Sequence, residues 1–594
     1  MNTQTPHLHY RLLPADLSGH RFQITLTIAQ PDPEGQVVSL PAWIPGSYLI
    51  RDFARQVETL SARSGRRALS VEKLDSQRWR IAPCKGTLVI EYTVYAWDLS
   101  VRSAHLDETH GFFNGTSVFL QPHGLEHLPC LLDIRPPEQH SDWSVHTSLP
   151  EATGLPGAAV RHGFGLYRAP DYDALIDHPV EMGTPQVITF QAHGAEHELV
   201  FTGVIPNLDL SRVAADVRAI CEAQIAFFEP ESKRAPFLDS AERYVFMTMV
   251  TGSDYGGLEH RASTALMASR SDLPVFGDRR QSEGYRTFLG LVSHEYFHTW
   301  HVKRIKPAAF APYDLARENH TRLLWVFEGF TSYYDDLFLV RTGLITEAQY
   351  LEMLAKTINQ VQTGPGRLKQ SIAQSSFDAW TRFYKQDENS PNAIVSYYAK
   401  GALAALGLDL TIRQATGNSR SLDDVMALLW QRYGRDFYAR DPQARNGLPE
   451  AAMPALIQEA TGVDVGAAIA AWVEGTADVP LAELLAPQGI RVESKRPEHA
   501  APVLGATTRK QGSDLVLRTV YEQGPAHEAD LSAGDVLVAI DGLRVTADSK
   551  LDELLSRYQS GQTVTLHVFR RDELRRFALA LAAAPVAVKL SRTE

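Results

Sequence analysis

Short alternating stretches of apolar and polar residues dominate the first third of the chain. Runs rich in β-branched and aromatic residues, such as His20–Ala29, Thr87–Tyr95, Ser117–Leu120 and Gln186–Phe190, are separated by Pro, Gly, Asn and Asp. Alternation with a period of two places apolar side chains on one face of a strand, and the separating residues favour turns. The region from about residue 6 to 205 is therefore predicted to be rich in β-strands.

A helical spacing replaces this alternation from about residue 209 to 480. It begins with Asp209–Phe228, where apolar residues recur at intervals of three and four, as they do on one face of a helix. One strand, Tyr244–Val250, is predicted to interrupt the helices. Further helices are predicted at Thr287–Trp300, Leu323–Arg341, Thr346–Gln362, Tyr397–Thr416, Ser421–Tyr433 and Met453–Thr461.

Alternation returns from about residue 490 to 585, in runs such as Asp514–Val520, Asp535–Ile540 and Thr563–Phe569. The chain thus reads β, then mainly α, then β. Because its 594 residues exceed what one hydrophobic core holds, the pattern predicts a multidomain α+β protein.

The charge composition argues against a nucleic-acid partner. The chain has 58 Lys and Arg against 70 Asp and Glu, a formal net charge of -12. Basic clusters are short, as in Lys303-Arg304-Ile305-Lys306 and Arg570-Arg571. Phosphate binding requires a concentrated basic face, so no nucleic-acid binding is expected.

Cysteine usage and the absence of long apolar segments bear on the cellular location. Cys84, Cys130 and Cys221 are widely spaced and contain no C-x-x-C pair, so we expect core thiols rather than disulfides or a thiolate metal site. No stretch approaches 18 apolar residues, and the first residues lack a basic segment followed by an apolar run. We expect no membrane partner and a cytoplasmic protein by default, or a periplasmic or secreted one if a leader has been removed.

The segment Leu291-Val-Ser-His-Glu-Tyr-Phe-His-Thr-Trp300 contains the motif H-E-x-x-H. A spacing of four places His294 and His298 on one face of a helix, where both imidazoles can bind one cation. In such sites zinc lowers the pKa of a bound water, and the glutamate of the motif, here Glu295, accepts the water proton. The motif therefore predicts metal-assisted hydrolysis; a solvated helix carrying two surface histidines is the alternative.

The next predicted helix supplies a candidate third ligand. Glu328 stands within Leu324-Trp-Val-Phe-Glu-Gly-Phe330, among aromatic and aliphatic residues. Burial of a carboxylate there requires a positive partner, and zinc is the expected one, with an Arg or Lys as the alternative. Glu318 and His320 lie in a more polar setting typical of an exposed loop, so Glu328 is favoured.

These segments resemble the glycyl aminopeptidase family of gluzincin metallopeptidases, which is related to aminopeptidase N. Tyr255-Gly-Gly-Leu-Glu-His260 is similar to the G-x-M-E-N strand of those relatives, whose glutamate binds the substrate α-amino group. The resemblance assigns this role to Glu259, with Gly256 and Gly257 beside the substrate. It also assigns Glu328 as the third metal ligand and one Zn2+ as the cofactor, although the chemistry of a His-His-Glu site also suits cobalt or manganese.

Two further segments extend the resemblance. Tyr397-Tyr-Ala-Lys-Gly-Ala402 is similar to Y-x-K-G-A, whose tyrosine donates to the oxyanion; Tyr398 fits this register and Tyr397 is the alternative. Pro41-Ala-Trp-Ile-Pro-Gly-Ser-Tyr-Leu-Ile-Arg-Asp52 is like a segment of the family's N-terminal domain and carries no chemistry of its own. The stretch Val302-Lys-Arg-Ile-Lys-Pro307 is also like this family.

The segment from Gly524-Pro-Ala to Gly534-Asp-Val-Leu-Val-Ala-Ile-Asp-Gly542 resembles a PDZ domain. PDZ domains bind extended peptides by adding a strand to a sheet edge. The carboxylate-binding loop expected near Val503-Leu-Gly-Ala506 departs from the family pattern, so a peptide-binding role and a structural or gating role both remain open.

The resemblance implies a β-sandwich-like N-terminal domain (1–180), a thermolysin-like zinc peptidase domain (181–395) with a helical extension (396–485), and a C-terminal PDZ domain (490–585). It implies a zinc metalloaminopeptidase that removes small N-terminal residues, Gly and Ala, from peptides with a free N-terminus. A metalloendopeptidase and a catalytically weak PDZ scaffold are the alternatives. The sequence predicts no oligomeric state.

Overall fold

The computed structural model describes residues 8–593, so the first seven residues of the predicted N-terminal domain lie outside it. The chain forms two compact units. The first contains residues up to Asn319, together with Tyr334–Leu344 and Met426–Pro449. The second contains His320–Tyr333, Ile345–Val425 and the residues from Glu450 onward.

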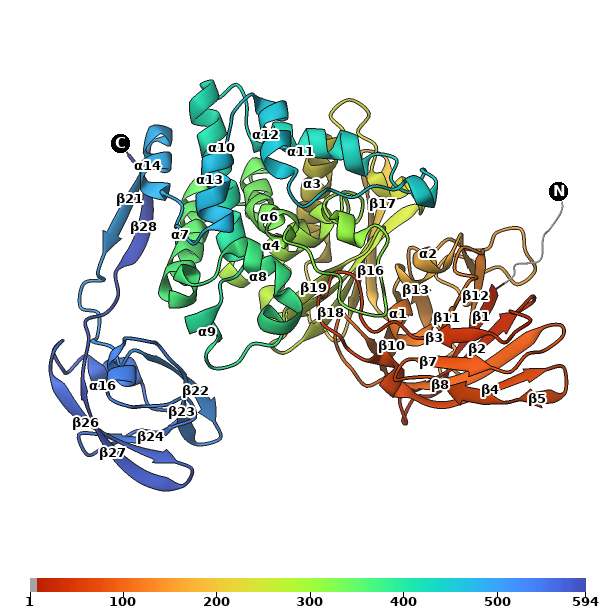
Figure 1. Ribbon diagram of the computed structural model, residues 1–594, viewed down its shortest axis with the longest axis horizontal. Helices are drawn as coiled ribbons and strands as arrows, with labels where there is room; N and C mark the ends of the chain where they lie inside the picture. Colours follow the sequence, from red (N-terminus) through yellow and green to blue (C-terminus); the bar gives the residue numbers. More distant parts are fainter. Residues whose placement is uncertain (1–7, 594) are drawn as a thin grey trace. The chain divides into compact units, whose positions relative to one another are not determined.

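The first unit begins with a β-rich domain built on a seven-stranded sheet in the order β14-β12-β1-β2-β8-β4-β5 (Figure 1). Every second residue of Leu88–Tyr95 is buried, as expected for a strand with one face on the core. The predicted β-rich N-terminal domain is thus confirmed. The strands of this sheet are β1 (Leu8–Asp16), β2 (Arg21–Ile28), β4 (Val57–Ser64), β5 (Arg67–Leu69), β8 (Leu88–Tyr95), β12 (Cys130–Ile134) and β14 (Gly165–Ala169).

Two four-stranded sheets complete this domain, in the orders β13-β15-β10-β9 and β11-β3-β7-β6. The short helix α2 (Tyr172–Ile176) precedes β15. The remaining strands are β3 (Val37–Ser39), β6 (Val71–Lys73), β7 (Arg78–Ile81), β9 (Ala104–Leu106), β10 (His110–Phe113), β11 (Gln121–Pro122), β13 (Ser144–His146) and β15 (Val180–Gly183).

The predicted strand at Ser117–Leu120 is wrong, because this segment contains the end of a short helix, α1 (Gly115–Val118). Three buried tyrosines satisfy its carbonyl groups in place of a neighbouring strand. Tyr92 donates to the carbonyl of Val118, Tyr172 to that of Phe119 and Tyr10 to that of Leu120, over 2.7–2.8 Å. An apolar run of four residues does not reveal such long-range partners, since a buried helical turn and a buried strand look alike at this length.

A five-stranded sheet in the order β16-β17-β18-β20-β19 follows in the first unit. β17, β18 and β20 are parallel, and β16 and β19 pair antiparallel at the two edges. α3 (Leu210–Phe228) and α4 (Glu283–Phe297) also belong to this region. The strands are β16 (Gln186–Ala192), β17 (Ala195–Thr202), β18 (Arg243–Thr251), β19 (Gly256–Glu259) and β20 (Ser263–Ser269).

The helical stretch was predicted to contain a single strand, Tyr244–Val250, but β20 runs beside it. Six of the seven residues of β20 are buried, so it lacks the alternation that signals a half-exposed strand.

Helices dominate the part of the second unit before residue 490, and their bounds lie within a few residues of the predictions. The helix predicted at Leu323–Arg341 is divided into α5 and α6, which meet at Glu328. The helices from this point are α5 (Leu324–Phe327), α6 (Gly329–Arg341), α7 (Glu347–Thr363), α8 (Ile372–Phe377), α9 (Ser390–Ala393), α10 (Ala399–Thr416), α11 (Leu422–Leu429), α12 (Met453–Thr461), α13 (Gly466–Ile469) and α14 (Leu481–Leu485).

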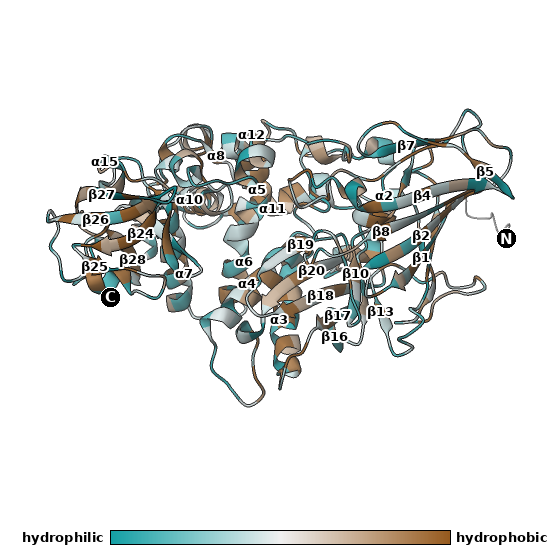
Figure 2. Ribbon diagram, turned by 90° about the horizontal axis from the view of Figure 1, so that it is seen from below, coloured by the Kyte–Doolittle hydropathy of each residue, from teal (hydrophilic) through white to brown (hydrophobic). Residues whose placement is uncertain are grey.

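The C-terminal region contains a β-sheet, as the alternation from about residue 490 predicted. Its sheet has the order β22-β23-β24-β26-β27, with β25 (Leu543–Arg544) paired to β24, and the short helices α15 (Pro525–Glu528) and α16 (Leu551–Leu555) complete it. Brown, hydrophobic residues mark β24 in Figure 2, and Leu537 and Ile540 of this strand are buried in the local core. The strands are β22 (Ala506–Gln511), β23 (Asp514–Val520), β24 (Val536–Ile540), β26 (Thr563–Arg570) and β27 (Glu573–Ala580), beside a separate pair, β21 (Ile490–Lys495) and β28 (Ala587–Arg592).

Within residues 8–593, no helix combines the length and the apolar character needed to cross a membrane. The cysteines are free; Cys130 and Cys221 are buried as expected of core thiols, whereas Cys84 is only partly buried.

Candidate metal and catalytic site

Helix α4 carries His294, Glu295 and His298 in and just beyond its last turn. Ser282 caps the start of the helix, where its side chain accepts from the backbone amide of Tyr285. The ring centroids of His294 and His298 lie 4.6 Å apart, and the planes are nearly perpendicular at 86°. Their Nε2 atoms are 3.0 Å apart. The two imidazoles therefore point at one place.

The second ring nitrogen of each histidine, Nδ1, faces a hydrogen-bond acceptor. His294 Nδ1 lies 3.0 Å from Asp335 Oδ2, and His298 Nδ1 lies 2.8 Å from the carbonyl oxygen of His301. Both acceptors require a proton on Nδ1, which leaves a lone pair on each Nε2 of the neutral rings. Two lone pairs that face one another at this distance repel unless a cation lies between them, so the pair fits a metal ion such as zinc.

Asp335, on α6, is the carboxylate that orients His294. Burial raises its pKa above the ordinary aspartate range, while the hydrogen bond and charge of His294 oppose this shift. The adjacent Asp336 has a pKa well above its ordinary value because it is buried and stands next to Asp335. An acceptor on the second nitrogen fixes the ring orientation of a metal-binding histidine and increases its basicity.

Glu295 and Glu259 face the same region from a helix and from a strand. One oxygen of each carboxylate and one ring nitrogen of His298 all lie within 4.8 Å of one another. Glu259 ends the edge strand β19, and it is only 4% exposed. Its Oε1 has no hydrogen-bond partner among residues 8–593, a costly state for a buried carboxylate oxygen.

Glycines make this close approach possible. A Cβ on Gly257, in β19, would lie 2.6 Å from Glu295 Cγ and closer still to Glu295 Oε1. A Cβ on Gly46 would lie 2.5 Å from Glu259 Oε2, and Gly46 has a φ of +94°, a value that favours glycine. Gly46 belongs to the Pro41–Asp52 segment, which therefore packs against Glu259. The backbone at Gly256, by contrast, has open space where a Cβ would stand.

Glu328, Tyr397 and Tyr398 belong to the second unit. Glu328 is 2% exposed. The residue after it, Gly329, approaches Gly401 so closely that a Cβ on Gly329 would lie 2.7 Å from Gly401 Cα and 3.1 Å from the carbonyl oxygen of Tyr397. Glycines in the E-G-F and K-G-A segments thus bring the start of α6 against the start of α10.

The two tyrosines differ in burial. Tyr397 is fully buried, and its hydroxyl has no hydrogen-bond partner within residues 8–593. Its pKa is raised well above the ordinary value by burial first, and then by the charges of Tyr384 and Glu328. Tyr398 is partly buried and lies at the N-terminal cap of α10, with its ring stacked 4.7 Å from that of Tyr397.

Two other groups of potential metal ligands escaped the sequence interpretation: His105, Asp107 and His110, and His146, His162 and Glu198. In the second, His146 and His162 approach different oxygens of Glu198, at 2.9 and 2.7 Å. Arg161 donates to the oxygen that faces His162, over 2.9 Å. This carboxylate is therefore already neutralised by side chains. The first group lies within six residues of the hairpin formed by β9 and β10, so its spacing could have signalled it. No local spacing signals the second group, because its members come from three separate segments.

Three family models match segments of the chain. Residues 9–184 match the model of the peptidase M61 N-terminal domain, residues 287–404 that of M61 glycyl aminopeptidase, and residues 502–581 that of a PDZ domain. No curated protein matches the chain.

The chain is also similar to solved structures. The crystal structure of an aminopeptidase N family protein from Idiomarina loihiensis is 41% identical, with a TM-score of 0.92, over 99% of this chain and 98% of that chain. An M1 zinc metallopeptidase from Deinococcus radiodurans is 14% identical, with a TM-score of 0.47, over 80% of this chain and 96% of that chain. On the match to the Idiomarina protein and to the family models, the chain belongs to the M61 glycyl aminopeptidase family of gluzincin peptide hydrolases, with a C-terminal PDZ domain.

Proposed function

We propose that the chain is a zinc aminopeptidase that removes small N-terminal residues, Gly and Ala, from peptides. The observation that carries the proposal is the position of Glu259. One oxygen of its buried carboxylate, Oε1, has no hydrogen-bond partner within residues 8–593, and one oxygen of the same carboxylate lies within 4.8 Å of Glu295 and His298. A substrate ammonium group would supply that partner, which explains a requirement for a free N-terminus.

His294, His298 and Glu328 would hold the zinc ion. The facing Nε2 atoms of the two histidines support the first two assignments. Support for Glu328 comes from its burial, because a carboxylate that is 2% exposed requires a positive partner. When bound, the ion polarises the scissile carbonyl and acidifies the attacking water.

Glu295 would act as the general base. It would accept the proton of the attacking water and then pass that proton to the leaving amine. Gly257 allows the Glu295 carboxylate to lie against β19, so the base stands beside the strand that would hold the substrate. β19 is an edge strand that pairs only with β20 among the described strands. A peptide that added to this edge along Gly256 and Gly257 would present its amine to Glu259.

Tyr398 would donate to the oxyanion, with Tyr397 as the alternative donor. The cap position of Tyr398 and its partial exposure support the first assignment. The second is supported by the Tyr397 hydroxyl, which has no hydrogen-bond partner within residues 8–593. We also propose the division into domains at residues 1–180, 181–395, 396–485 and 490–585. The PDZ domain would bind a peptide segment or gate substrate entry.

The test is the initial rate of glycyl-p-nitroanilide hydrolysis, beside its N-acetylated counterpart, with and without a metal chelator. Cleavage of the free-amine substrate alone, lost on chelation and restored by zinc, is the expected result. Cleavage of the blocked substrate at a comparable rate would instead indicate an endopeptidase. A series of aminoacyl-p-nitroanilides from Gly and Ala to Leu and Phe tests the preference for small residues.

A further inference from the structure

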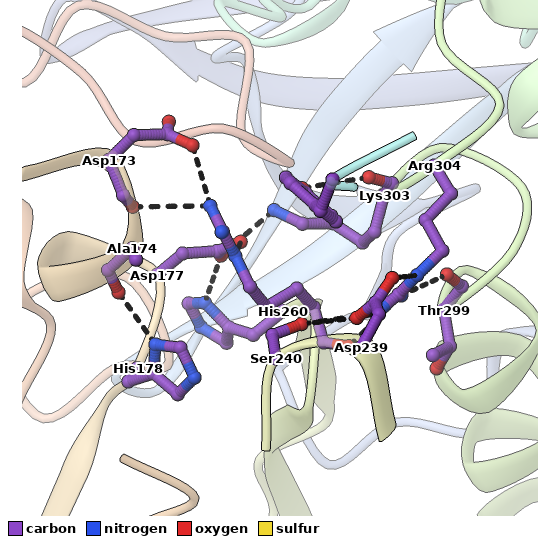
Figure 3. Close-up of polar contacts among 12 residues, drawn as sticks. Asp173, Ala174, Asp177, His178, Asp239, Ser240, His260, Thr299, Lys303 and Arg304 are labelled. Atoms are coloured by element: carbon purple, nitrogen blue, oxygen red, sulfur yellow. Dashed lines mark hydrogen bonds and ion pairs between the residues drawn. The ribbon is translucent and has the colours of Figure 1, made fainter. Parts of the chain in front are cut away.

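A buried carboxylate of the N-terminal domain, Asp177, stands where two segments of the proposed active site meet. It follows helix α2, and its side chain is 11% exposed. Figure 3 shows it between His260 and Lys303. Asp177 Oδ1 accepts from Lys303 Nζ over 2.9 Å and lies 3.0 Å from His260 Nδ1, while Oδ2 accepts from Arg261 Nε over 2.9 Å. One carboxylate thus contacts three side chains of the peptidase region.

The contacts of Asp177 with His260 and Arg261 fix the end of β19, which carries Glu259. His260 and Arg261 are the two residues after Glu259, in the turn that joins β19 to β20. The backbone of this turn is fixed as well, because Arg304 donates to the carbonyl of Arg261 over 3.1 Å. His260 and Arg261 are 1% and 4% exposed, so solvent does not satisfy them. The direction of the Glu259 carboxylate therefore depends on this anchor.

The contact of Asp177 with Lys303 fixes the segment that follows the H-E-x-x-H helix. The backbone amide of Lys303 donates to the carbonyl of His298 over 3.0 Å, and Arg304 donates to the carbonyl of Thr299 over 2.8 Å. Between these residues lies His301, whose carbonyl accepts from His298 Nδ1. Lys303, held by Asp177, thus fixes the loop that orients the ring of His298.

Several positive side chains surround Asp177, and a second carboxylate, Asp173, accepts from Arg261 Nη2 over 2.6 Å. Besides Arg261 and Lys303, the side chain of Lys306 is buried there, 4.5 Å above the ring of Tyr313. Burial and then the charge of Lys303 lower the pKa of Lys306 to about 7. Arg304 has its own partner, Asp239, at 2.5 and 2.8 Å. Without the Asp177 charge, Lys303 would lose its only ion-pair partner within residues 8–593.

We propose that Asp177 is a positioning residue for peptide hydrolysis, through which the N-terminal domain sets both Glu259 and the His301 carbonyl that orients His298. The proposal rests on the function proposed above. It deepens that function by making the N-terminal domain a part of the active site. In this proposal Asp177 acts through His260, Arg261 and Lys303 rather than by touching the substrate or the metal.

The test compares Asp177→Asn with the parent and with Glu181→Gln. Glu181 is a matched control, since it is another buried carboxylate, on β15, and the hydrogen-bond partner of its carboxylate within residues 8–593 is His110 Nδ1, at 3.1 Å. For each protein one would measure the melting temperature, kcat and KM for glycyl-p-nitroanilide, the rate ratio to the N-acetylated substrate, and zinc affinity by competition with a chelating indicator.

For Asp177→Asn we expect kcat/KM and zinc affinity each to fall by about 10–100-fold, the usual effect of losing a partner behind a metal ligand. The free-amine to N-acetyl rate ratio should also fall, because Glu259 moves. Glu181→Gln should lower only the melting temperature. Should Asp177→Asn not fold, Asp177→Glu keeps the charge and displaces it by one methylene, and the same losses are expected.

If the folded Asp177 variant had the same KM, rate ratio and zinc affinity as the parent, the inference would be overturned. The proposed function would remain intact. An inactive parent would instead overturn the proposed function.

Discussion

Gly257 and Glu295 are in such close contact that no other residue type fits at position 257 without displacing the carboxylate. A Cβ there would overlap Glu295 Oε1 and lie 2.5 Å from Glu295 Cδ. Real Cβ atoms do not approach other heavy atoms this closely, and the neighbouring strand β20 leaves β19 little freedom to move. The glycine is thus the reason that the proposed general base can stand directly over the edge strand.

Gly257→Ala is therefore expected to lower kcat by about 100-fold, the cost of displacing a catalytic group by about 1 Å. Gly252→Ala is the matched control, since Gly252 has no proposed role in binding and a Cβ there meets nothing within 4 Å. The measurement is steady-state hydrolysis of glycyl-p-nitroanilide by both variants. Equal rates for the two would show that Glu295 does not act from this position.

Glu295→Gln removes the proposed proton acceptor and keeps its size. We expect kcat to fall by about 100–10,000-fold, the usual contribution of a general base, while the melting temperature and the zinc content stay close to those of the parent. Metal analysis of the purified variant separates loss of base from loss of metal. Retention of the parental rate would remove Glu295 from the mechanism.

Asp335→Asn should weaken zinc binding, whereas Glu295→Gln should leave it unchanged. Its carboxylate accepts from His294 Nδ1 at 3.0 Å, and an amide oxygen is a weaker acceptor for this proton. Zinc affinity is expected to fall by about 10–100-fold, and activity should recover when zinc is added in excess. Titration of activity against free zinc tests this. A zinc affinity equal to that of Glu295→Gln would mean that Asp335 does not tune the site.

The sequence was sufficient for the features that depend on local spacing. His294 and His298 had to share a helix face because they are four residues apart, and their facing Nε2 atoms agree with this. The strands of the PDZ-containing region were predicted from alternation, and β23 has the predicted bounds. Helix ends were less certain, since α5 and α6 meet at Glu328 where one continuous helix was predicted.

The sequence was insufficient where the partner is distant along the chain. Lys303 and Arg304 were interpreted as a short basic piece, yet each is 1% exposed. Their carboxylate partners, Asp177 and Asp239, precede them by 126 and 65 residues, so no local pattern relates them. The same reason hid the role of Gly46, because nothing in its own segment shows that Glu259 packs against it.

Buried His197 makes stability sensitive to acid. It lies 2.8 Å from the hydroxyl of Tyr296 and 3.0 Å from the carbonyl of Ala195, and burial lowers its pKa from 6.5 to about 3. The unfolded chain binds a proton near pH 6.5 and the folded chain does not. Stability is therefore complete above pH 6.5 and falls as the pH drops toward 3. At pH 5 this single group should cost about 2 kcal/mol.

Chemical unfolding at pH 7.5 and pH 5 tests this. His197→Gln has no such proton to bind, so the parent should lose about 2 kcal/mol more than the variant between these pH values. His193→Gln, at an exposed histidine of the hairpin between β16 and β17, should behave as the parent does. Parallel losses in the parent and in His197→Gln would assign the acid sensitivity to other groups.

The choice between the two tyrosines can be decided by removing one hydroxyl at a time. Tyr397→Phe and Tyr398→Phe keep the stacked rings, whose centroids are 4.7 Å apart, and delete only the proposed donor. Loss of an oxyanion donor usually costs about 100–1000-fold in kcat with little change in KM, because the donor acts on the transition state. We expect this loss for Tyr398→Phe. Tyr397→Phe should be nearly neutral or stabilising, since it removes a buried hydroxyl that has no hydrogen-bond partner within residues 8–593. The reverse result, a large kcat effect at Tyr397 and none at Tyr398, would assign the donor to the buried hydroxyl, which the charge of Glu328 already affects.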